Sequence, residues 1–148
     1  ETTACQLVLT CGITPHPNGS GAEKIKKSAL GSERMVMTQH FATTQQALQH
    51  IRETIPEMHI VAMETTAKSK IYHAVNFEPF HQREGGGGGS GVAIILGNEV
   101  TGVDTELLQQ VDDIIELPTF GKKNSLNVAA CAPVVIYEIL RQWNAEPR

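Results

Sequence analysis

Two segments of the chain combine glycine, carboxylate and amide groups in patterns that suit a ligand site. The first, residues 96–102 (LGNEVTG), directly follows the most apolar run, Val92–Leu96. Gly97 and Gly102 let the backbone turn and approach a ligand closely, and Glu99 places a carboxylate between them. The segment is not a GxGxxG dinucleotide loop, because an Asn-Glu pair replaces the second glycine. Taken alone, it also fits a plain strand-to-helix turn with a solvated glutamate.

The second segment surrounds the start of the last predicted helix. A strand ends at Pro118, a basic loop with a glycine follows over residues 119–123, and Asn124, Ser125 and Asn127 open the helix. One such side chain suffices as an N-cap. Asn127 already stands inside an apolar segment, so we expect it to be buried and to need a hydrogen-bonding partner. A ligand or a substrate can provide that partner.

Four short apolar runs predict the buried strands that position these segments. They are Cys5–Cys11, Ile60–Met63, Val92–Leu96 and Ile114–Leu117. Strands without clean alternation, separated by helices, predict an α/β fold with a mostly parallel sheet flanked by helices. Ligands of such sheets bind beyond the carboxyl ends of the strands. Both segments follow a predicted strand and therefore belong to that edge.

The predicted helices have recognisable ends. Thr43 and Gln46 form a capping box for a helix that Pro56 ends, and Asp104 caps a short second helix. The last helix, Ser125–Trp143, carries apolar residues on most faces, so we expect it to be largely buried and bent at Pro133. The region from His16 to about Gly31, rich in Gly, Ser, Asn and Lys, is predicted to be a long loop.

Composition limits the class of protein. The chain has 148 residues, the size of one domain, and its 41% of hydrophobic residues is enough for a core. A net charge of −4 excludes a histone-like binder that is basic over its whole surface, although a local basic patch remains possible. No apolar run approaches the ~20 residues that cross a bilayer, so no membrane association is expected.

The cysteines and histidines show no ligand spacing. Cys5, Cys11 and Cys131 are odd in number and form no CxxC pair, and the six histidines all precede the two segments. We therefore expect no metal site. Free thiols are typical of a reducing compartment, which predicts an intracellular protein, either cytoplasmic or in an organelle after removal of a transit peptide.

The glycine run at residues 85–91 (GGGGGSG) has its own interpretation. It has no side chains that could grip a ligand and a high conformational entropy, so we predict a flexible, solvent-exposed loop inside the domain. The chain begins with Glu1 rather than Met and enters its first strand almost at once. It is therefore expected to be part of a longer protein.

The two segments closely resemble motifs of the SpoU branch of the SPOUT RNA methyltransferases. Leu96–Gly102 matches the family's LGNExxG motif, and Ile115–Ala130 matches its strand, Pro, glycine loop and SLNV. Tyr137–Gln142 matches its YExxRQ. Upstream, Leu7–Pro15 resembles a TGxTP strand end. Val61–Thr66, with Ser69, resembles an ALE-T segment, and residues 26–33 resemble KxALGAE. The resemblance covers nearly the whole chain except the glycine run.

The resemblance implies a C-terminal trefoil knot, a feature otherwise nearly absent from proteins. It further implies that the knot binds S-adenosyl-L-methionine, held bent mostly by backbone groups. Residues at the matching positions would line this pocket, namely Thr65, Gly97, Leu117 and Leu126. The implied reaction is methyl transfer to a ribose 2′-hydroxyl of tRNA or rRNA, carried out by a homodimer that pairs through its last helix.

The same resemblance assigns roles to the polar residues. Glu99, Ser125 and Asn127 match the family's active-site groups. We interpret Glu99 and Asn127 as positioning elements and Ser125 as a contact to substrate or to the partner subunit. A ribose hydroxyl is a poor nucleophile and needs help to lose its proton. Basic residues that can hold RNA phosphates lie in two groups, Lys26 and Lys27, with Lys24, and Lys122 and Lys123. Exposed lysines on a solvated loop are the plain alternative.

Three departures from the family pattern qualify the expected activity. A first motif, with a strand, a helix and an arginine that activates the hydroxyl, would precede Glu1. The expected domain, residues 1–148, therefore lacks its first strand and helix and should be a poor catalyst alone. Pro133 replaces a usual small residue, and the glycine run lengthens a connection. A non-catalytic RNA-binding or scaffold protein that keeps the knot is the alternative, which the intact Glu99, Ser125 and Asn127 disfavour.

Overall fold

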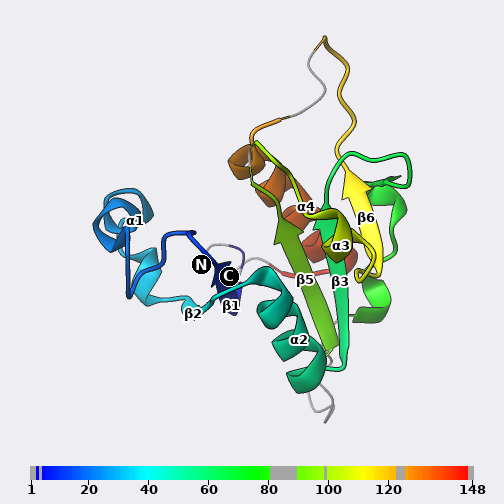
Figure 1. The fold of residues 1–148 in the computed structure, drawn as a ribbon. Helices are drawn as coiled ribbons and strands as arrows, with labels where there is room; N and C mark the ends of the chain where they lie inside the picture. The colour runs from blue at the N-terminus through cyan, green and yellow to red at the C-terminus, as the bar shows by residue number, and fades with distance from the viewer. Residues whose placement is uncertain (1–2, 4, 81–89, 99, 123–125, 147–148) are drawn as a thin grey trace. The chain divides into compact units, whose positions relative to one another are not determined.

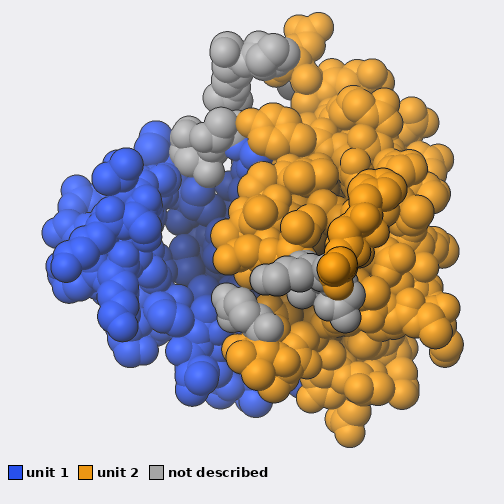
Figure 2. All heavy atoms as spheres, turned by 90° about the horizontal axis from the view of Figure 1, so that it is seen from above, with its two compact units in different colours: residues 1–54 blue, residues 55–148 orange. Residues whose placement is uncertain are grey.

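All strand pairs among the described residues are parallel, and they form two separate sheets. The computed structural model describes residues 3, 5–80, 90–98, 100–122 and 126–146. The chain divides into two compact units, residues 1–54 and 55–148, coloured separately in Figure 2. Each unit contains one sheet. The predicted α/β class with parallel strands is confirmed, but in place of one sheet there are two.

The first unit contains the smaller sheet. Its elements are β1 (Leu7–Cys11), α1 (Ala22–Ala29), a 3₁₀ turn (Ser32–Arg34), β2 (Met37–Phe41) and α2 (Thr44–Thr54). β1 pairs with β2 from Leu7↔Met37 to Cys11↔Phe41. Helix α2 buries Ala47 and Leu48. The predicted cap is confirmed, because the Gln46 amide donates to the Thr43 hydroxyl at 3.2 Å.

The prediction of a long loop from His16 to about Gly31 was wrong. Residues 22–29 form helix α1, which begins after Gly21 in the left-handed region (φ 80°). Ala22, Ile25 and Ala29 share one half-buried face, while the lysines are exposed. The apolar spacing of three and four residues is helical, but it is weak, and the surrounding Gly and Ser residues obscure it.

Two short strands were also missed by the sequence analysis. β2 has the sequence MTQHF, in which three polar residues stand between two apolar ones, and β4 (Lys70–Ile71) has only two residues. Neither forms a continuous apolar run. Their strand structure comes from pairing with β1 and β6, respectively, which is a tertiary effect.

The second unit is built on a four-stranded sheet of order β4-β6-β3-β5 (Figure 1). Its elements are β3 (Glu57–Met63), β4, 3₁₀ turns at Tyr72–Ala74 and Glu78–Phe80, β5 (Ser90–Leu96), α3 (Thr105–Leu108), β6 (Asp113–Glu116) and α4 (Val128–Gln142). In the central β3, the consecutive residues Ile60, Val61 and Ala62 are fully buried. Both faces of this strand are therefore covered, as expected for a parallel sheet.

The glycine run falls partly outside the described residues. Residues 85–89 of the predicted loop belong to the part of the chain that is not described. Ser90 and Gly91, however, are not loop residues. They begin β5 and pair with Glu57 and Met58 of β3. The loop predicted over residues 85–91 is therefore wrong at its last two positions, because pairing with β3 extends the strand toward its N-terminus.

The core of the second unit lies between α4 and one face of its sheet. Val135 and Ile139 of α4 join Val61, Ile115 and Phe77 in one buried cluster. A buried aliphatic or aromatic side chain stabilises the folded state by ~1.5–3 kcal/mol. The opposite side of α4 is not covered. Val134 is 40% exposed and Tyr137 is 55% exposed, so the expectation of a largely buried last helix was wrong.

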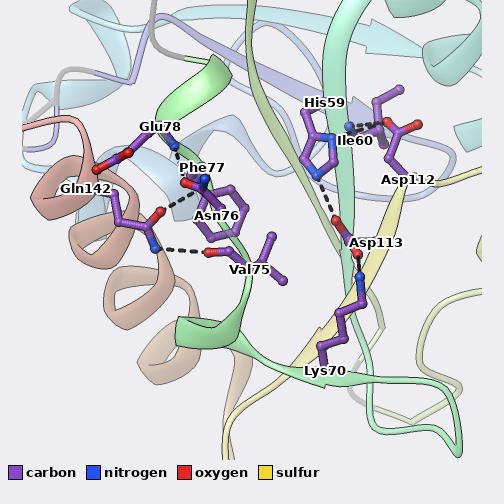
Figure 3. A network of polar contacts seen from close by, with 10 residues as sticks. All are labelled: His59, Ile60, Lys70, Val75, Asn76, Phe77, Glu78, Asp112, Asp113 and Gln142. Carbon is purple, nitrogen blue, oxygen red and sulfur yellow. Dashed lines mark hydrogen bonds and ion pairs between the residues drawn. The ribbon is translucent and has the colours of Figure 1, made fainter.

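The end of α4 is fixed by a side-chain amide (Figure 3). Gln142 accepts from the Phe77 amide at 2.6 Å and donates to the Val75 carbonyl at 3.0 Å. Trp143 adds a bond from its indole nitrogen to the Phe77 carbonyl at 2.7 Å. The backbone around the buried Phe77 thus takes its partners from α4. These bonds give the YExxRQ motif a structural role.

The same motif contains an ion pair. Arg141 contacts the Glu138 carboxylate through two nitrogens, at 2.8 and 2.7 Å. The hydrogen bond from this guanidinium lowers the pKa of Glu138 to about 2, against burial, which raises it. The carboxylate is therefore charged over the whole range in which proteins normally work. It also accepts from Gln142 at 2.9 Å and so orients the amide.

A second polar network joins the amino-terminal parts of the strands (Figure 3). The His59 imidazole lies 3.0 Å from the Asp113 carboxylate, which also accepts from Lys70 at 2.5 Å. Asp112 accepts from the Ile60 amide at 2.7 Å. His59 stacks on Phe80, with ring centroids 4.0 Å apart. The network links β3, β4 and β6 away from the strand ends that carry the motifs.

Replacing Gln142 by Ala should lower the free energy of unfolding by about 1–3 kcal/mol, because the buried Phe77 amide loses its partner. Trp143 is the only tryptophan of the chain, so its fluorescence during urea unfolding reports on the second unit. Gln109→Ala, at an exposed position after α3, is the control and should change little. Equal losses in the two variants would show that the Gln142 amide does not hold α4.

Candidate functional site

Three neighbouring strands of the second unit end level with one another. Met63 of β3 pairs with Leu96 of β5 on one side and with Ile115 of β6 on the other. The residues that follow each strand therefore emerge at one edge of the sheet, visible at the arrowheads in Figure 1. Thr65, Gly97 and Leu117, which the resemblance assigns to a cofactor pocket, all belong to these emerging segments.

The segment after β5 closes into a tight turn. Asn98 and Gly102 exchange backbone hydrogen bonds of 3.1 and 2.9 Å. The Asn98 side chain fills the turn by accepting from the amides of Val100 at 2.8 Å and Thr101 at 3.3 Å. An asparagine side chain is suited to this because it bonds backbone groups close to it in sequence. Asn98 therefore has a structural role in the LGNExxG motif.

Both glycines of this turn are required by its own packing. A Cβ on Gly97 would lie 2.5 Å from the Gly102 carbonyl carbon. Gly102 has φ +69°, a conformation that favours glycine, and a Cβ there would collide with a carboxylate oxygen of Glu64. We expected the glycine at 97 to allow close approach of a ligand. The structure gives a different reason, since loop backbone occupies that space.

Glu64 connects all three strand ends, and the sequence analysis assigned it no role. Its carboxylate accepts from the Val103 amide at 2.8 Å and from the Thr65 amide at 3.2 Å. Its own amide donates to the Ile115 carbonyl at 3.0 Å. The sequence marks the position of Glu64, directly after the predicted strand Ile60–Met63, but not the amides that it binds.

A second carboxylate ties the loop after β3 to β6. Glu116 lies 2.8 Å from the Ser69 hydroxyl, which is also 2.7 Å from the Thr66 carbonyl. The Thr66 amide donates to the same hydroxyl at 3.1 Å. Residues 66–69 thus form a short closed turn attached to the neighbouring strand. This turn carries the exposed Thr65 at its entrance.

Asn127 does not have the environment predicted for it. It is exposed, and its side chain accepts from the Ala129 amide at 2.8 Å as the N-cap of α4. The prediction of a buried Asn127 was wrong, because the helix begins only at Val128 and its first residues are open to solvent. The start of α4 lies at the same end of the sheet as the strand tips (Figure 1). Leu126 is 55% exposed, and Leu117 packs against the core.

Several predicted site residues cannot be placed. Glu99, Ser125 and Lys123 lie outside the described residues. Lys122 is exposed after Gly121. Lys26 and Lys27 are exposed on α1, which belongs to the first unit. Of the three candidate catalytic residues, Asn127 is thus the one that belongs to the described part of the chain.

Cysteines and metals contribute no further candidate in the part of the chain that is described. Cys5, Cys11 and Cys131 are free thiols, and burial raises the pKa of Cys11 and Cys131, which keeps both protonated. Since the thiolate is the nucleophile, neither is activated. Among the described residues, no group of three or more His, Cys, Asp or Glu could hold a metal ion. No described helix is long and apolar enough to span a membrane.

The fold and this edge together define an α/β protein in which hydrogen-bonded loops follow the carboxyl ends of the parallel strands. The profile of the SpoU rRNA Methylase family matches residues 5–137. This is most of the chain, so the chain belongs to that family, which is one of RNA methyltransferases. The resemblance found in the sequence is confirmed.

Relatives and solved structures agree with this assignment. The chain is 27% identical over 124 residues to the tRNA (guanosine(18)-2′-O)-methyltransferase of Escherichia coli strain K12. This match covers 84% of this chain and 48% of that protein. It is 45% identical over 53 residues to an uncharacterized tRNA/rRNA methyltransferase of Borreliella burgdorferi. That match covers 36% of this chain and 23% of that protein. The matches thus span less than half of these relatives.

The fold is shared with a solved structure. An AdoMet-bound rRNA methyltransferase from Sinorhizobium meliloti superposes with a TM-score of 0.75 at 20% identity, covering 94% of this chain and 47% of that one. At this level of identity the likeness shows the fold alone. It supports the mixed α/β architecture with parallel strands.

Replacing Gly97 by Ala should destabilise the second unit by about 1–3 kcal/mol, because a Cβ there overpacks the Gly102 backbone. The matched control is Gly121→Ala, where a Cβ would meet nothing within 4 Å. Urea unfolding monitored by Trp143 fluorescence measures both. A Gly97→Ala variant as stable as Gly121→Ala would contradict the packing described for the turn.

Proposed function

We propose that this chain is the methyltransferase domain of an RNA 2′-O-methyltransferase that uses S-adenosyl-L-methionine. The observation that carries the proposal is the family match over residues 5–137, which includes both motifs in order. The 2′-hydroxyl specificity is supported by the name of the Escherichia coli relative. The activity, the RNA substrate and the partners of the whole protein are part of this proposal, as is an intracellular location.

The chemistry of the strand ends fits the proposed cofactor. An adenosyl group has apolar faces and hydrogen-bonding edges, and small-molecule sites combine apolar surface with a few placed polar groups. The edge offers the exposed apolar side chains of Leu96 and Val100, 46% and 90% exposed, beside the hydrogen-bonded turns after β3 and β5. We assign Thr65, Gly97, Leu117 and Leu126 to the pocket. When bound, the cofactor's sulfonium supplies the methyl group.

The remaining polar residues are assigned to the substrate. Glu99 and Asn127 would position the ribose, and Ser125 would contact the RNA or the partner subunit. Orientation matters here because the leaving thioether is neutral, so that placing the hydroxyl in line with the methyl group counts more than stabilising the leaving group. Asn127 stands at the N-terminus of a 15-residue helix, and this positive end of the helix dipole favours negative partners.

RNA phosphates would be held by exposed lysines. Lys122 belongs to the motif loop together with Lys123, and Lys26 and Lys27 lie on α1. Each neutralised phosphate steepens the salt dependence of RNA binding. The net charge of −4 makes such local groups, rather than the overall charge, the source of RNA affinity.

The knot and the dimer complete the proposal. The chain between β6 and α4, which contains most of the Ile115–Ala130 motif, would thread the knot. The uncovered side of α4, with Pro133, Val134 and Tyr137 exposed, has the apolar character of an interface between two copies. With Tyr72, Glu138 and Arg141, these residues line a shallow hollow.

Isothermal titration of the chain should give heats for S-adenosylmethionine and for S-adenosylhomocysteine and none for NAD, because residues 96–102 do not form the GxGxxG loop that binds a dinucleotide. Tight NAD binding with no response to S-adenosylmethionine would sink the assignment. Binding of both the cofactor and RNA without methylation of any RNA would favour a scaffold.

Replacing Asn127 by Ala should reduce methylation or cofactor affinity at least tenfold, well beyond the ~1 kcal/mol cost of a lost helix cap. The matched control is Thr43→Ala, which removes the cap of α2 and should lower stability alone. Titration calorimetry, thermal unfolding and methylation assays on both variants separate the two effects. An Asn127→Ala variant that behaves like Thr43→Ala would show that this residue is only a cap.

A further inference from the structure

We infer that Glu64 is a positioning residue, which holds the turn of residues 97–103 in the shape that the cofactor pocket requires. The inference rests on the proposed function, since it concerns the same edge of the sheet. Glu64 touches neither the proposed substrate groups nor the reacting atoms in this assignment. It acts through the backbone of the turn.

The first argument is the direction of its hydrogen bonds. One carboxylate oxygen of Glu64 accepts from the Val103 amide at 2.8 Å, and the other accepts from the Thr65 amide at 3.2 Å. Val103 is the last residue of the turn after β5, and Thr65 follows β3. A single side chain therefore joins two of the segments assigned to the pocket. Hydrogen bonds to a charged carboxylate are stronger than neutral ones.

The second argument is the lack of a side chain at Gly102. The space that a Cβ of Gly102 would occupy contains the Glu64 carboxylate. Gly102 in turn exchanges backbone bonds with Asn98, and a Cβ on Gly97 would lie 2.5 Å from the Gly102 carbonyl carbon. The carboxylate and the two motif glycines thus form one packed unit. A change in any of them alters the path of the turn.

The third argument is that the other hydrogen bonds described for the turn, those of Asn98 with Val100, Thr101 and Gly102, lie within the turn itself. Val100 is 90% exposed, and Thr101 is also exposed. Val103, by contrast, is buried, and its amide donates the hydrogen bond that Glu64 accepts. Without this bond the turn would sample other shapes, and cofactor binding would then have to restore the competent one. The result is weaker binding with the pocket residues unchanged.

The test compares Glu64→Ala with Glu64→Gln and Asp112→Ala in the full chain. Asp112 is the matched control, because its carboxylate also accepts a backbone amide of a neighbouring strand, that of Ile60 at 2.7 Å, but at the amino-terminal part of the sheet. Calorimetry with S-adenosylhomocysteine gives the affinity, and thermal unfolding gives the stability. Proton exchange of the Val103 amide without cofactor gives the local effect.

Glu64→Ala should weaken S-adenosylhomocysteine binding about 10- to 100-fold, the effect of a lost charge-assisted hydrogen bond, and should speed exchange at Val103. Glu64→Gln, which keeps one acceptor oxygen, should recover most of the affinity. Asp112→Ala should lower the melting temperature with an unchanged affinity. If Glu64→Ala lowers the melting temperature but binds as the unaltered chain does, the positioning role is overturned while the proposed function stands. If the unaltered chain binds no S-adenosylhomocysteine, the proposed function fails, and the role of Glu64 fails with it.

Discussion

The parallel register of three strands is the constraint on which the rest of the site depends. Met63 stands level with both Leu96 and Ile115, so the segments that leave β3, β5 and β6 emerge at the same height. A shift of one residue in either pairing would turn every side chain of the shifted strand to the other face. The buried cluster of Val61, Ile115 and the α4 side chains opposes such a shift. The core of the second unit therefore sets the geometry of its edge.

Two carboxylates then connect the segments that follow these three neighbouring strands. Glu64 attaches the turn after β5 to the end of β3, and Glu116 attaches the turn at Ser69 to β6. Each bond spans two strands, and each uses a backbone group or a short hydroxyl. Ordering the two glutamate side chains costs rotamer entropy, which these bonds offset. The residues named by the family motifs, Gly97 and Asn98 among them, mainly shape the chain.

The sequence predicted the elements with strong local signals and missed those that depend on tertiary context. The apolar runs at Val92–Leu96 and Ile114–Leu117 and the cap at Asp104 correspond to β5, β6 and α3. β2 and β4 carry no apolar run and exist through their pairing partners. The helix α1 was hidden by its weak apolar spacing. Burial was the least predictable property, because it depends on packing partners that are distant in sequence. For that reason the sequence did not predict the exposure of Asn127 and of the outer side of α4.

The location of the candidate site could be predicted from the sequence, but the contacts that hold it together could not. Motif spacing placed Thr65, Gly97 and Leu117 at strand ends, and the register brings those ends together. The role of Glu64 could not be read from its neighbours in the sequence, since its partner amide at Val103 is 39 residues away. Gly102 likewise has its reason in that distant carboxylate. Both are cross-strand effects, which appear only once the register is known.

The most direct measurement is the change in backbone amide NMR shifts when S-adenosylhomocysteine is added to the ¹⁵N-labelled chain. Binding at the common edge predicts that the amides of Thr65, Gly97, Leu117 and Leu126 shift together. Those of His59 and Asp113, in the polar network toward the amino-terminal ends of the same strands, should stay in place. Shifts confined to that network, or spread evenly over both ends of the sheet, would contradict a cofactor site built by the register of β3, β5 and β6.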